Sequence, residues 1–260
     1  MKSPITNYAV TIDLWLTLAG EIDDSKIKTE SPKRSQLRIN MTHNLLKRFG
    51  EHVDYQTLEH AFKSISEQIN SDHAHGTDFL FKQRLIEMLK NIDNDLPRRL
   101  SPIGISAIAT VIDYSFICIP PTLFNGAVNA LYTLSKLPVK IGLISNTGLT
   151  SPVGYRRWFQ NLGILDFFHH VTFSNGVACA KPNKSIFQFT LKELDIRPEN
   201  AIHIGDNLYS DILGASQVGM KSIWIEGENN LKIDASPTYT VDSIGMVPAI
   251  VKQWLNCRSG

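Results

Sequence analysis

The sequence is poor in the features that mark secreted, zinc-binding or nucleic-acid-binding proteins. It contains only three cysteines, Cys118, Cys179 and Cys257, and no Cys/His spacing typical of a zinc site. A disulfide framework is therefore not expected, and a reducing cytosol is the simplest compartment. The formal net charge of +1 offers no electrostatic argument for nucleic acid or an anionic membrane surface as a partner.

Long apolar runs are also scarce. The first residues lack the charged start and apolar stretch of a secretory signal peptide. Residues 103–121 are fairly apolar, but Asp113 and glycine or proline breaks interrupt them, which predicts a buried helix rather than a membrane span. We therefore expect a soluble, cytoplasmic chain with no membrane partner, and its 260 residues are enough to bury a sizeable core.

The first clear element is a buried strand that leads to a carboxylate. Residues 8–12 are mostly apolar and partly β-branched, and Asp13 follows them directly. Open α/β sheets bind ligands in the crevice outside the carboxyl ends of their strands, where Asp13 would lie. Taken alone, Asp13 could equally well cap the following turn or helix.

Strand signals almost vanish between Ala19 and about Leu100, and apolar residues recur at helical spacing instead. The three stripes are Leu37, Met41, Leu45, Leu46 and Phe49; Leu58, Phe62, Ile65 and Ile69; and Phe79, Leu80, Leu85, Ile86 and Leu89. Each stripe predicts a helix with one buried face, and together they predict a small helical bundle.

Strands and helices alternate again after Pro120-Pro121, which is typical of βαβ units and a parallel sheet. The predicted strands are 139–144, 171–173, 201–204, 221–226 and 239–241, and the predicted helices are 128–137, 155–162, 185–194, 211–218 and 247–255. One strand precedes the helical segment and the others follow it. We therefore expect an α/β core formed by residues 1–18 and 121–260, with residues 19–120 inserted as a helical domain.

Polar motifs stand at four places along this pattern. They are Asp13 with Thr17-Leu18, then Ser145-Asn146-Thr147, then Lys181-Pro182-Asn183, and finally Gly205-Asp206 followed by Asp211 and Gly214-Ala215. In these motifs and their order the chain resembles the haloacid dehalogenase-like hydrolase superfamily, from Val10 to about Ile244. The resemblance implies a Rossmann-like parallel sheet with helices on both faces, and a helical cap formed by the insertion after the first motif.

The resemblance also implies roles for the motif residues. Asp13 would be the nucleophile that forms an ester with the substrate, and Thr17, Ser145 and Lys181 would complete the catalytic group. Leu14, Trp15, Asn146 and Thr147 would bind the substrate, the first three through backbone N–H groups. The implied ligands of Mg²⁺ are the carboxylates of Asp13, Asp206 and Asp211 and the backbone carbonyl of Trp15.

Trp15 departs from the pattern of the family's phosphatases, which usually carry a general-acid aspartate two residues after the nucleophile. An indole cannot exchange protons in that role. One interpretation is a Mg²⁺-dependent phosphatase or phosphotransferase whose substrate has a good leaving group or whose acid comes from the cap. The cap histidines are His43, His52, His60, His73 and His75.

Two other interpretations are open. Family dehalogenases carry an aromatic residue at the position of Trp15, so the chain could hydrolyse carbon–halogen bonds; a non-catalytic binder of phosphorylated ligands is the third possibility. The acidic pair Asp206 and Asp211 favours phosphate chemistry on a small phosphorylated metabolite, because those dehalogenases generally work without metal. The cap cations Arg34, Arg38, Lys82 and Arg84 are plausible contacts for an anionic substrate tail, and either a monomer or a homodimer is expected.

Overall fold

A six-stranded parallel sheet forms the centre of the chain in the computed structural model, which describes residues 6–21, 33–227 and 236–258. The strand order is β5-β4-β1-β6-β7-β8, where these are His170–Phe173, Lys140–Ser145, Ala9–Ile12, Ala201–Gly205, Lys221–Ile225 and Tyr239–Val241. This confirms the predicted fold class. Because β1 pairs with both β4 and β6, the residue that follows β1 lies in the middle of the sheet's carboxyl edge.

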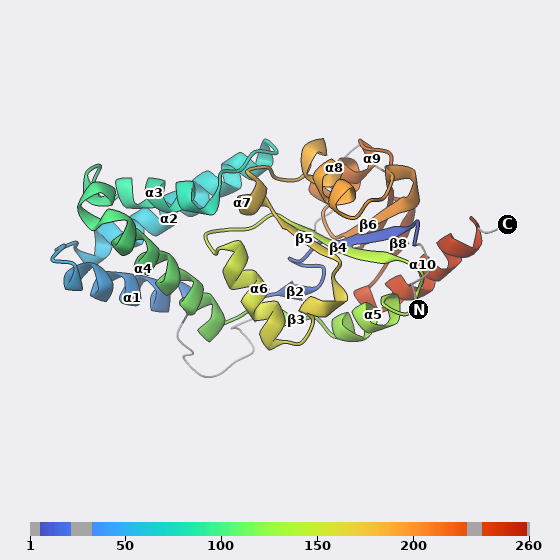
Figure 1. Ribbon diagram of the computed structural model, residues 1–260, viewed down its shortest axis with the longest axis horizontal. Helices are drawn as coiled ribbons and strands as arrows, with labels where there is room; N and C mark the ends of the chain where they lie inside the picture. Colours follow the sequence, from blue (N-terminus) through green and yellow to red (C-terminus); the bar gives the residue numbers. More distant parts are fainter. Residues whose placement is uncertain (1–5, 22–32, 228–235, 259–260) are drawn as a thin grey trace.

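Helices cover both faces of the sheet (Figure 1). One layer contains α5 (Ala127–Leu134), α6 (Pro152–Asn161) and α10 (Val247–Asn256), and the other contains α8 (Lys184–Glu193) and α9 (Gly214–Ser216). Successive side chains of a strand point to opposite faces, so Val10 and Ile12 pack with the first layer and Ala9 with the second. Both faces of β1 are thus apolar and buried, as the sequence pattern predicts.

The short elements connect these layers. They are α7 (Ser174–Val177), the 3₁₀ turns Leu165–Phe167, Pro198–Asn200 and Ile244–Met246, and a π-helical turn at Leu208–Leu213 that runs into α9. The sequence predicts a single helix over 211–218 at the last of these places. In the structure the helical segment begins earlier, at Leu208, and its first part is π-helical, a geometry often found at functional sites.

The insertion is a helical domain with its own core. Its helices are α1 (Arg34–Arg48), α2 (Tyr55–Ala74), α3 (Phe81–Lys90) and α4 (Leu96–Cys118), seen at the left of Figure 1. Buried side chains such as Leu46, Leu58 and Ile108 form a cluster separate from the cores of the sheet. The chain enters and leaves this domain through an antiparallel pair, β2 (Ala19–Gly20) and β3 (Thr122–Leu123), which is too short to leave a periodic signal in the sequence.

The predicted apolar stripes of α1 and α3 are only partly right. Residues Phe79 and Leu80 precede α3 and are exposed, while Arg84 is buried in that helix. In α1 the buried residues are Ile39, Thr42 and Leu46, whereas Leu37 and Met41 are half-buried. The neighbours of each helix decide which of its faces is buried. For α1 this is the packing against α4, and for α3 it is the ion pairing of Arg84; both outweigh the local apolar pattern.

The helix predicted at 103–121 begins earlier and is buried along one face only. Ile108 and Ile112 point into the cap core, while Ile103 is 77% exposed. A kink at Ser101-Pro102, where Ser101 has φ 58°, separates the first turn from the rest. By length and composition α4 could cross a membrane, yet its buried face packs in the cap as a core helix would.

A buried ion-pair cluster ties α2 to α3 and yields a first prediction. The Arg84 guanidinium lies 2.5 Å from the Asp72 carboxylate and 2.9 Å from that of Asp78, whose side chain is 1% exposed. Replacing Arg84 by Met leaves a buried carboxylate without its cation, so we expect the free energy of unfolding to fall by about 3–5 kcal/mol. Urea unfolding followed by circular dichroism measures this change.

The matched control is Lys82→Met on the same helix, where the side chain is exposed. It should change the free energy of unfolding by less than about 0.5 kcal/mol. Equal stabilities for the two variants would contradict a structural role for the Arg84 cluster.

Candidate active site

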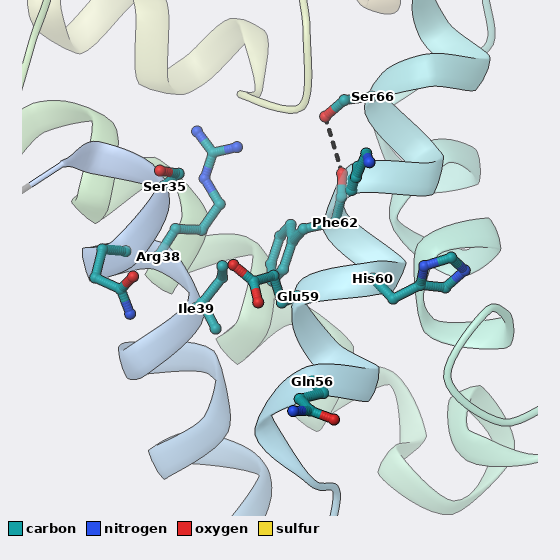
Figure 2. A pocket seen from close by; sticks show the side chains of 10 residues that line it. Ser35, Arg38, Ile39, Gln56, Glu59, His60, Phe62 and Ser66 are labelled. Atoms are coloured by element: carbon teal, nitrogen blue, oxygen red, sulfur yellow. Dashed lines mark hydrogen bonds between the residues drawn. The ribbon is translucent and has the colours of Figure 1, made fainter.

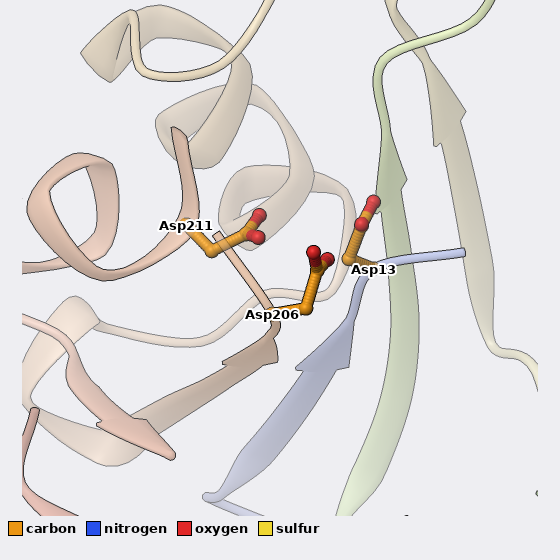
Figure 3. Close-up of side chains that lie close together, drawn as sticks. All are labelled: Asp13, Asp206 and Asp211. Carbon is orange, nitrogen blue, oxygen red and sulfur yellow. The ribbon is translucent and has the colours of Figure 1, made fainter. Parts of the chain in front are cut away.

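The carboxyl edge of the sheet brings Asp13 and Asp206 side by side. Ile12, the last residue of β1, pairs with Ile204 of β6, and the Asp13 N–H donates to the Ile204 carbonyl at 2.9 Å. Asp206 follows β6 directly, so parallel register alone puts the two carboxylates next to each other. Figure 3 shows the carboxylate of Asp211, which comes from the π-helical turn after β6, lying on the other side of Asp206 from Asp13.

Asp13, Asp206 and Asp211 form a compact acidic cluster. One carboxylate oxygen from each lies within 4.8 Å of the others. Asp211 is completely buried and Asp13 is 6% exposed. Such an all-oxygen donor set suits a hard divalent cation, which keeps water ligands and binds through a few carboxylates.

One buried ammonium group lies between two of these carboxylates. Lys181 Nζ is 2.6 Å from Asp13 Oδ1 and 2.5 Å from Asp211 Oδ1, and the Lys181 side chain is 1% exposed. The side chain of Asn146 holds the Lys181 backbone from both sides, accepting from its N–H at 2.8 Å and donating to its carbonyl at 3.0 Å. The second and third motifs, 35 residues apart, are therefore joined through the side chain of Asn146. The sequence had suggested a role only for the backbone N–H of this residue.

The cluster is short of positive charge. Burial, with repulsion from Asp211 and Asp206, raises the pKa of Asp13 to about 8 even though Lys181 lowers it. Burial and the charge of Asp211 likewise raise the pKa of Asp206 to about 6. Burial would raise the pKa of Asp211 too, but Lys181 and His203 outweigh it and hold that pKa at about 2. A single ammonium cannot neutralise three carboxylates, so the arrangement fits an additional cation.

His203 is a site residue that the sequence analysis missed. It lies in β6, completely buried, with Nδ1 2.8 Å from the Thr11 hydroxyl and Nε2 3.2 Å from Asp211 Oδ1. Burial lowers its pKa, so the neutral ring can accept from Thr11 and donate to Asp211. The signal was a lone histidine in an otherwise apolar strand, which by itself does not distinguish a positioning residue from a core residue.

Gly205 explains why the fourth motif begins with glycine. A Cβ at this position would lie 2.3 Å from the carboxyl group of Asp211, closer than any real contact. The absence of a side chain at position 205 is therefore what allows Asp211 to turn toward Asp13, and the Asn207 N–H then donates to its Oδ2 at 3.0 Å.

The remaining predicted residues lie around this cluster. The Thr17 hydroxyl donates to Asp206 Oδ1 at 3.3 Å, and Ser145 is buried at the end of β4 with its Oγ 3.2 Å from the Asn146 carbonyl. The Leu14 side chain is buried in the core of the sheet. The N–H of Thr147 donates to the Ser174 hydroxyl at 2.9 Å, and the substrate-binding role of Thr147 stays a prediction.

A cavity of about 240 Å³ lies where the cap meets the core. Its floor is formed by Trp15 and the loop 148–150, which follow Asp13 and Ser145 in the chain, and its cap side includes Arg34 and Arg38. Trp15 packs edge-on against Tyr155, with 6.4 Å between ring centroids. Two of the cap cations predicted as substrate contacts thus line the same cavity as Trp15, which stands two residues after Asp13 in the chain.

The other cap candidates lie elsewhere. Arg84 is used in the ion pairs with Asp72 and Asp78, and Lys82 does not line the cavity. Among the described residues that line this cavity there is no histidine, although five cap histidines were candidates for a general acid. His73, for example, has its Nε2 3.0 Å from Asp78 Oδ2.

Comparison with known proteins places this geometry in a family. The haloacid dehalogenase-like hydrolase family model matches residues 9–219. A glyceraldehyde 3-phosphate phosphatase of Pyrococcus furiosus is 28% identical over 214 residues, 82% of each chain. A pyrimidine 5′-nucleotidase of Escherichia coli is 31% identical over 151 residues, 57% of this chain and 61% of the relative.

Among solved structures, a 2-haloacid dehalogenase from Pseudomonas syringae pv. Tomato is similar in fold. It superposes with a TM-score of 0.65 and 18% sequence identity, covering 95% of this chain and 99% of that one. The likeness extends through both the sheet and the helical insertion, and at this identity it concerns the fold alone.

The tight fit around Asp211 leads to a prediction. Gly205→Ala should lower the free energy of unfolding by about 1–3 kcal/mol, because the new methyl group must displace the Asp211 carboxyl and its partners. Gly227→Ala is the control, since a Cβ there meets nothing within 4 Å. Urea unfolding of both variants tests the expectation, and a Gly205→Ala protein as stable as the control would refute the steric argument.

Proposed function

The chain belongs to the haloacid dehalogenase-like hydrolase family, and on this basis we propose that it is a Mg²⁺-dependent phosphatase of small phosphorylated metabolites with Asp13 as the nucleophile. The observation that carries the proposal is the shortage of positive charge in the site, where three carboxylates share one ammonium group. A divalent cation would complement such a site and would also offset the negative charge of a bound phosphate group. Relatives named as phosphatase and nucleotidase support the same reaction class.

In the proposed reaction Asp13 attacks phosphorus at the carboxyl edge of the sheet. An oxygen of its carboxylate would form a bond to phosphorus while the bond from phosphorus to the leaving oxygen breaks. Water would then cleave the aspartyl phosphate, releasing inorganic phosphate and restoring the carboxylate. The shared hydrogen bonds from Lys181 hold Asp13 in one orientation, so little reorganisation is needed before the attack.

The groups around Asp13 would bind the phosphate oxygens. Lys181 would contribute its charge, Ser145 its hydroxyl, and the residues after Asp13 and Ser145 their backbone N–H groups. Asp13, Asp206, Asp211 and the Trp15 carbonyl would hold Mg²⁺. The bound ion supplies positive charge that offsets the repulsion between the carboxylates and the negative charge of the phosphate.

The cavity provides no obvious acid for the leaving group. Among its described residues, Glu21 makes a bidentate pair with Arg34, and burial raises the pKa of Tyr155 far above the neutral range. Trp15 occupies the position two residues after the nucleophile and cannot donate a proton as an acid does. We therefore infer that the preferred leaving groups depart without protonation, as aryl, enol or acyl groups do.

A carbon–halogen hydrolase is the second candidate, favoured by the aromatic Trp15 and by the fold likeness to a 2-haloacid dehalogenase. Halide leaves unprotonated, so that reaction needs no general acid either. The three-carboxylate cluster argues against it, since attack on carbon has no need of a divalent cation. A non-catalytic phosphate binder would retain the same cluster but would turn over neither class of substrate.

Metal dependence tests the main proposal. We expect phosphate release from 4-nitrophenyl phosphate with Mg²⁺, loss of that release in excess chelator, and recovery when Mg²⁺ is restored. Asp206→Asn should lower kcat/KM at least about 10²-fold, because one carboxylate of the cation site is lost. Asp242→Asn, an exposed aspartate after β8, should retain the activity.

Asp13→Asn is the blank for this assay and should release phosphate at the background rate. Halide release from a 2-haloacid in chelator, without phosphate release in Mg²⁺, would replace the proposal by the second candidate. Absence of both reactions would favour the binder.

The leaving group provides a separate prediction. Losing a general acid typically costs a factor of about 10²–10⁴ in rate, and the cost is greatest for basic leaving groups. We therefore expect kcat/KM for phenyl or 4-nitrophenyl phosphate to exceed that for n-propyl phosphate by at least about 10²-fold. Steady-state kinetics on a series of phosphomonoesters measures this dependence, and equal values across the series would mean that an acid is present.

A further inference from the structure

The Arg38 guanidinium forms no ion pair with any residue that the structure describes. Its neighbours are the Ser115 hydroxyl at 3.5 Å and the Phe62 ring, whose centroid is 6.0 Å away. Burial and the neighbouring Arg34 lower its pKa to about 10. Arg38 is half-buried, and a partly enclosed guanidinium with no ion-pair partner among the described residues marks a place where an anion can bind.

Arg34, one turn earlier on α1, lines the same cavity and has an anionic partner. Its two terminal nitrogens bond to the Glu21 carboxylate at 2.7 and 3.0 Å, its Nε donates to the Ile119 carbonyl, and it lies over the Phe116 ring. Glu21 pairs directly with Arg34 and attracts Arg38 only at longer range, without forming an ion pair with it.

The nearby Asp113 attracts Arg38 at longer range but forms no ion pair with it. Its carboxylate accepts from the Ser151 N–H at 2.8 Å and from the Ser151 hydroxyl. Figure 2 shows the Arg38 side chain extended past Phe62, with its guanidinium at the end of the α1–α2 pocket nearest Ser66 and away from the Glu59 carboxylate. Arg38 and Ser66 line that pocket and the cap–core cavity alike, so the guanidinium lies at the junction of the two spaces.

We propose that the substrate is a phosphomonoester of few carbons with a second anionic group, a carboxylate or another phosphate, which Arg38 binds in the cap–core cavity. This proposal rests on the proposed function, because the first phosphate is taken to bind at Asp13. The planar guanidinium matches the two oxygens of either group, and its enclosure strengthens the interaction. Trp15 and Phe116 enclose the short carbon linker between the two ends.

The size of the cavity limits the linker. Its volume of about 240 Å³ lies below the range of about 300–1,000 Å³ usual for pockets of drug-sized ligands. A cavity of about 150 Å³ suffices for benzene, so a ring of that size or a chain of a few carbons fits. The cavity thus favours small dianionic metabolites over nucleotides.

A series of aryl phosphates tests the proposal with one class of leaving group. Phenyl phosphate is compared with 2-, 3- and 4-carboxyphenyl phosphate and with the bisphosphate of 1,3-dihydroxybenzene, in Mg²⁺. For wild-type protein we expect kcat/KM of at least one charged compound to exceed that of phenyl phosphate by at least about tenfold. The carboxylate and bisphosphate arms identify which anion Arg38 prefers.

Variants connect this preference to Arg38. Arg38→Met should reduce the ratio of charged to uncharged substrate to near one, mainly through KM, and Arg38→Lys should restore part of it because it keeps the charge but loses the planar fork. Arg98→Met, a cap arginine whose side chain is 81% exposed, should keep the wild-type ratio. Melting temperatures establish that the variants are folded.

Binding distinguishes the failure of this proposal from the failure of the proposed function. Calorimetric titration of Asp13→Asn with the same compounds and Mg²⁺ needs no turnover, and the charged ligand should bind at least about tenfold tighter than phenyl phosphate. If phosphate is released from every compound with equal kcat/KM and Arg38→Met changes no ratio, the Arg38 proposal is wrong while the phosphatase stands. If no compound is hydrolysed but the binding preference persists and requires Arg38, the anion site stands without the reaction.

Discussion

The hydrogen bonds from Lys181 to Asp13 and Asp211 are the constraint on which the site depends. They join the end of β1 to the turn after β6, and they place an ammonium group where burial would otherwise drive all three carboxylates to protonate. These buried ion pairs are costly to form, so a contribution to stability alone does not explain their presence. Their value lies in orientation, since a fixed carboxylate beside a fixed cation is what an attack on a phosphate group requires.

Several parts of the core exist to keep that arrangement in place. Asn146 holds the backbone of Lys181, His203 holds Asp211, and the lack of a side chain at Gly205 leaves room for the Asp211 carboxylate. The cap contributes Arg38, a half-buried cation that lines the same cavity as Trp15. The sheet edge, where we propose the chemistry takes place, and the helical insertion, which we propose selects the substrate, each have their own apolar core.

The core was predictable to a useful degree, and the cap much less so. Every strand of the six-stranded sheet coincides with a strand predicted from the sequence. The signal is clearest for the central strands β1, β4 and β6, because a strand buried on both faces leaves an apolar run. The buried sides of α1 and α3 were misjudged, since Thr42 and Arg84 are buried there for reasons that lie on other helices. β2 and β3 were missed because two-residue strands have no period, and His203 because a lone histidine in a strand has no signature.

The sequence by itself determined the alternation of strands and helices, the position of the helical insertion and the placement of Asp13, Ser145 and Asp206 at strand ends, because these follow from local apolar patterns and from the direction of the chain. Only the tertiary structure decided which side chains form hydrogen bonds and ion pairs with one another. The contact of Lys181 with both Asp13 and Asp211 and the pairing of Arg34 rather than Arg38 with Glu21 depend on distances between segments far apart in the chain, and no spacing in the sequence encodes them.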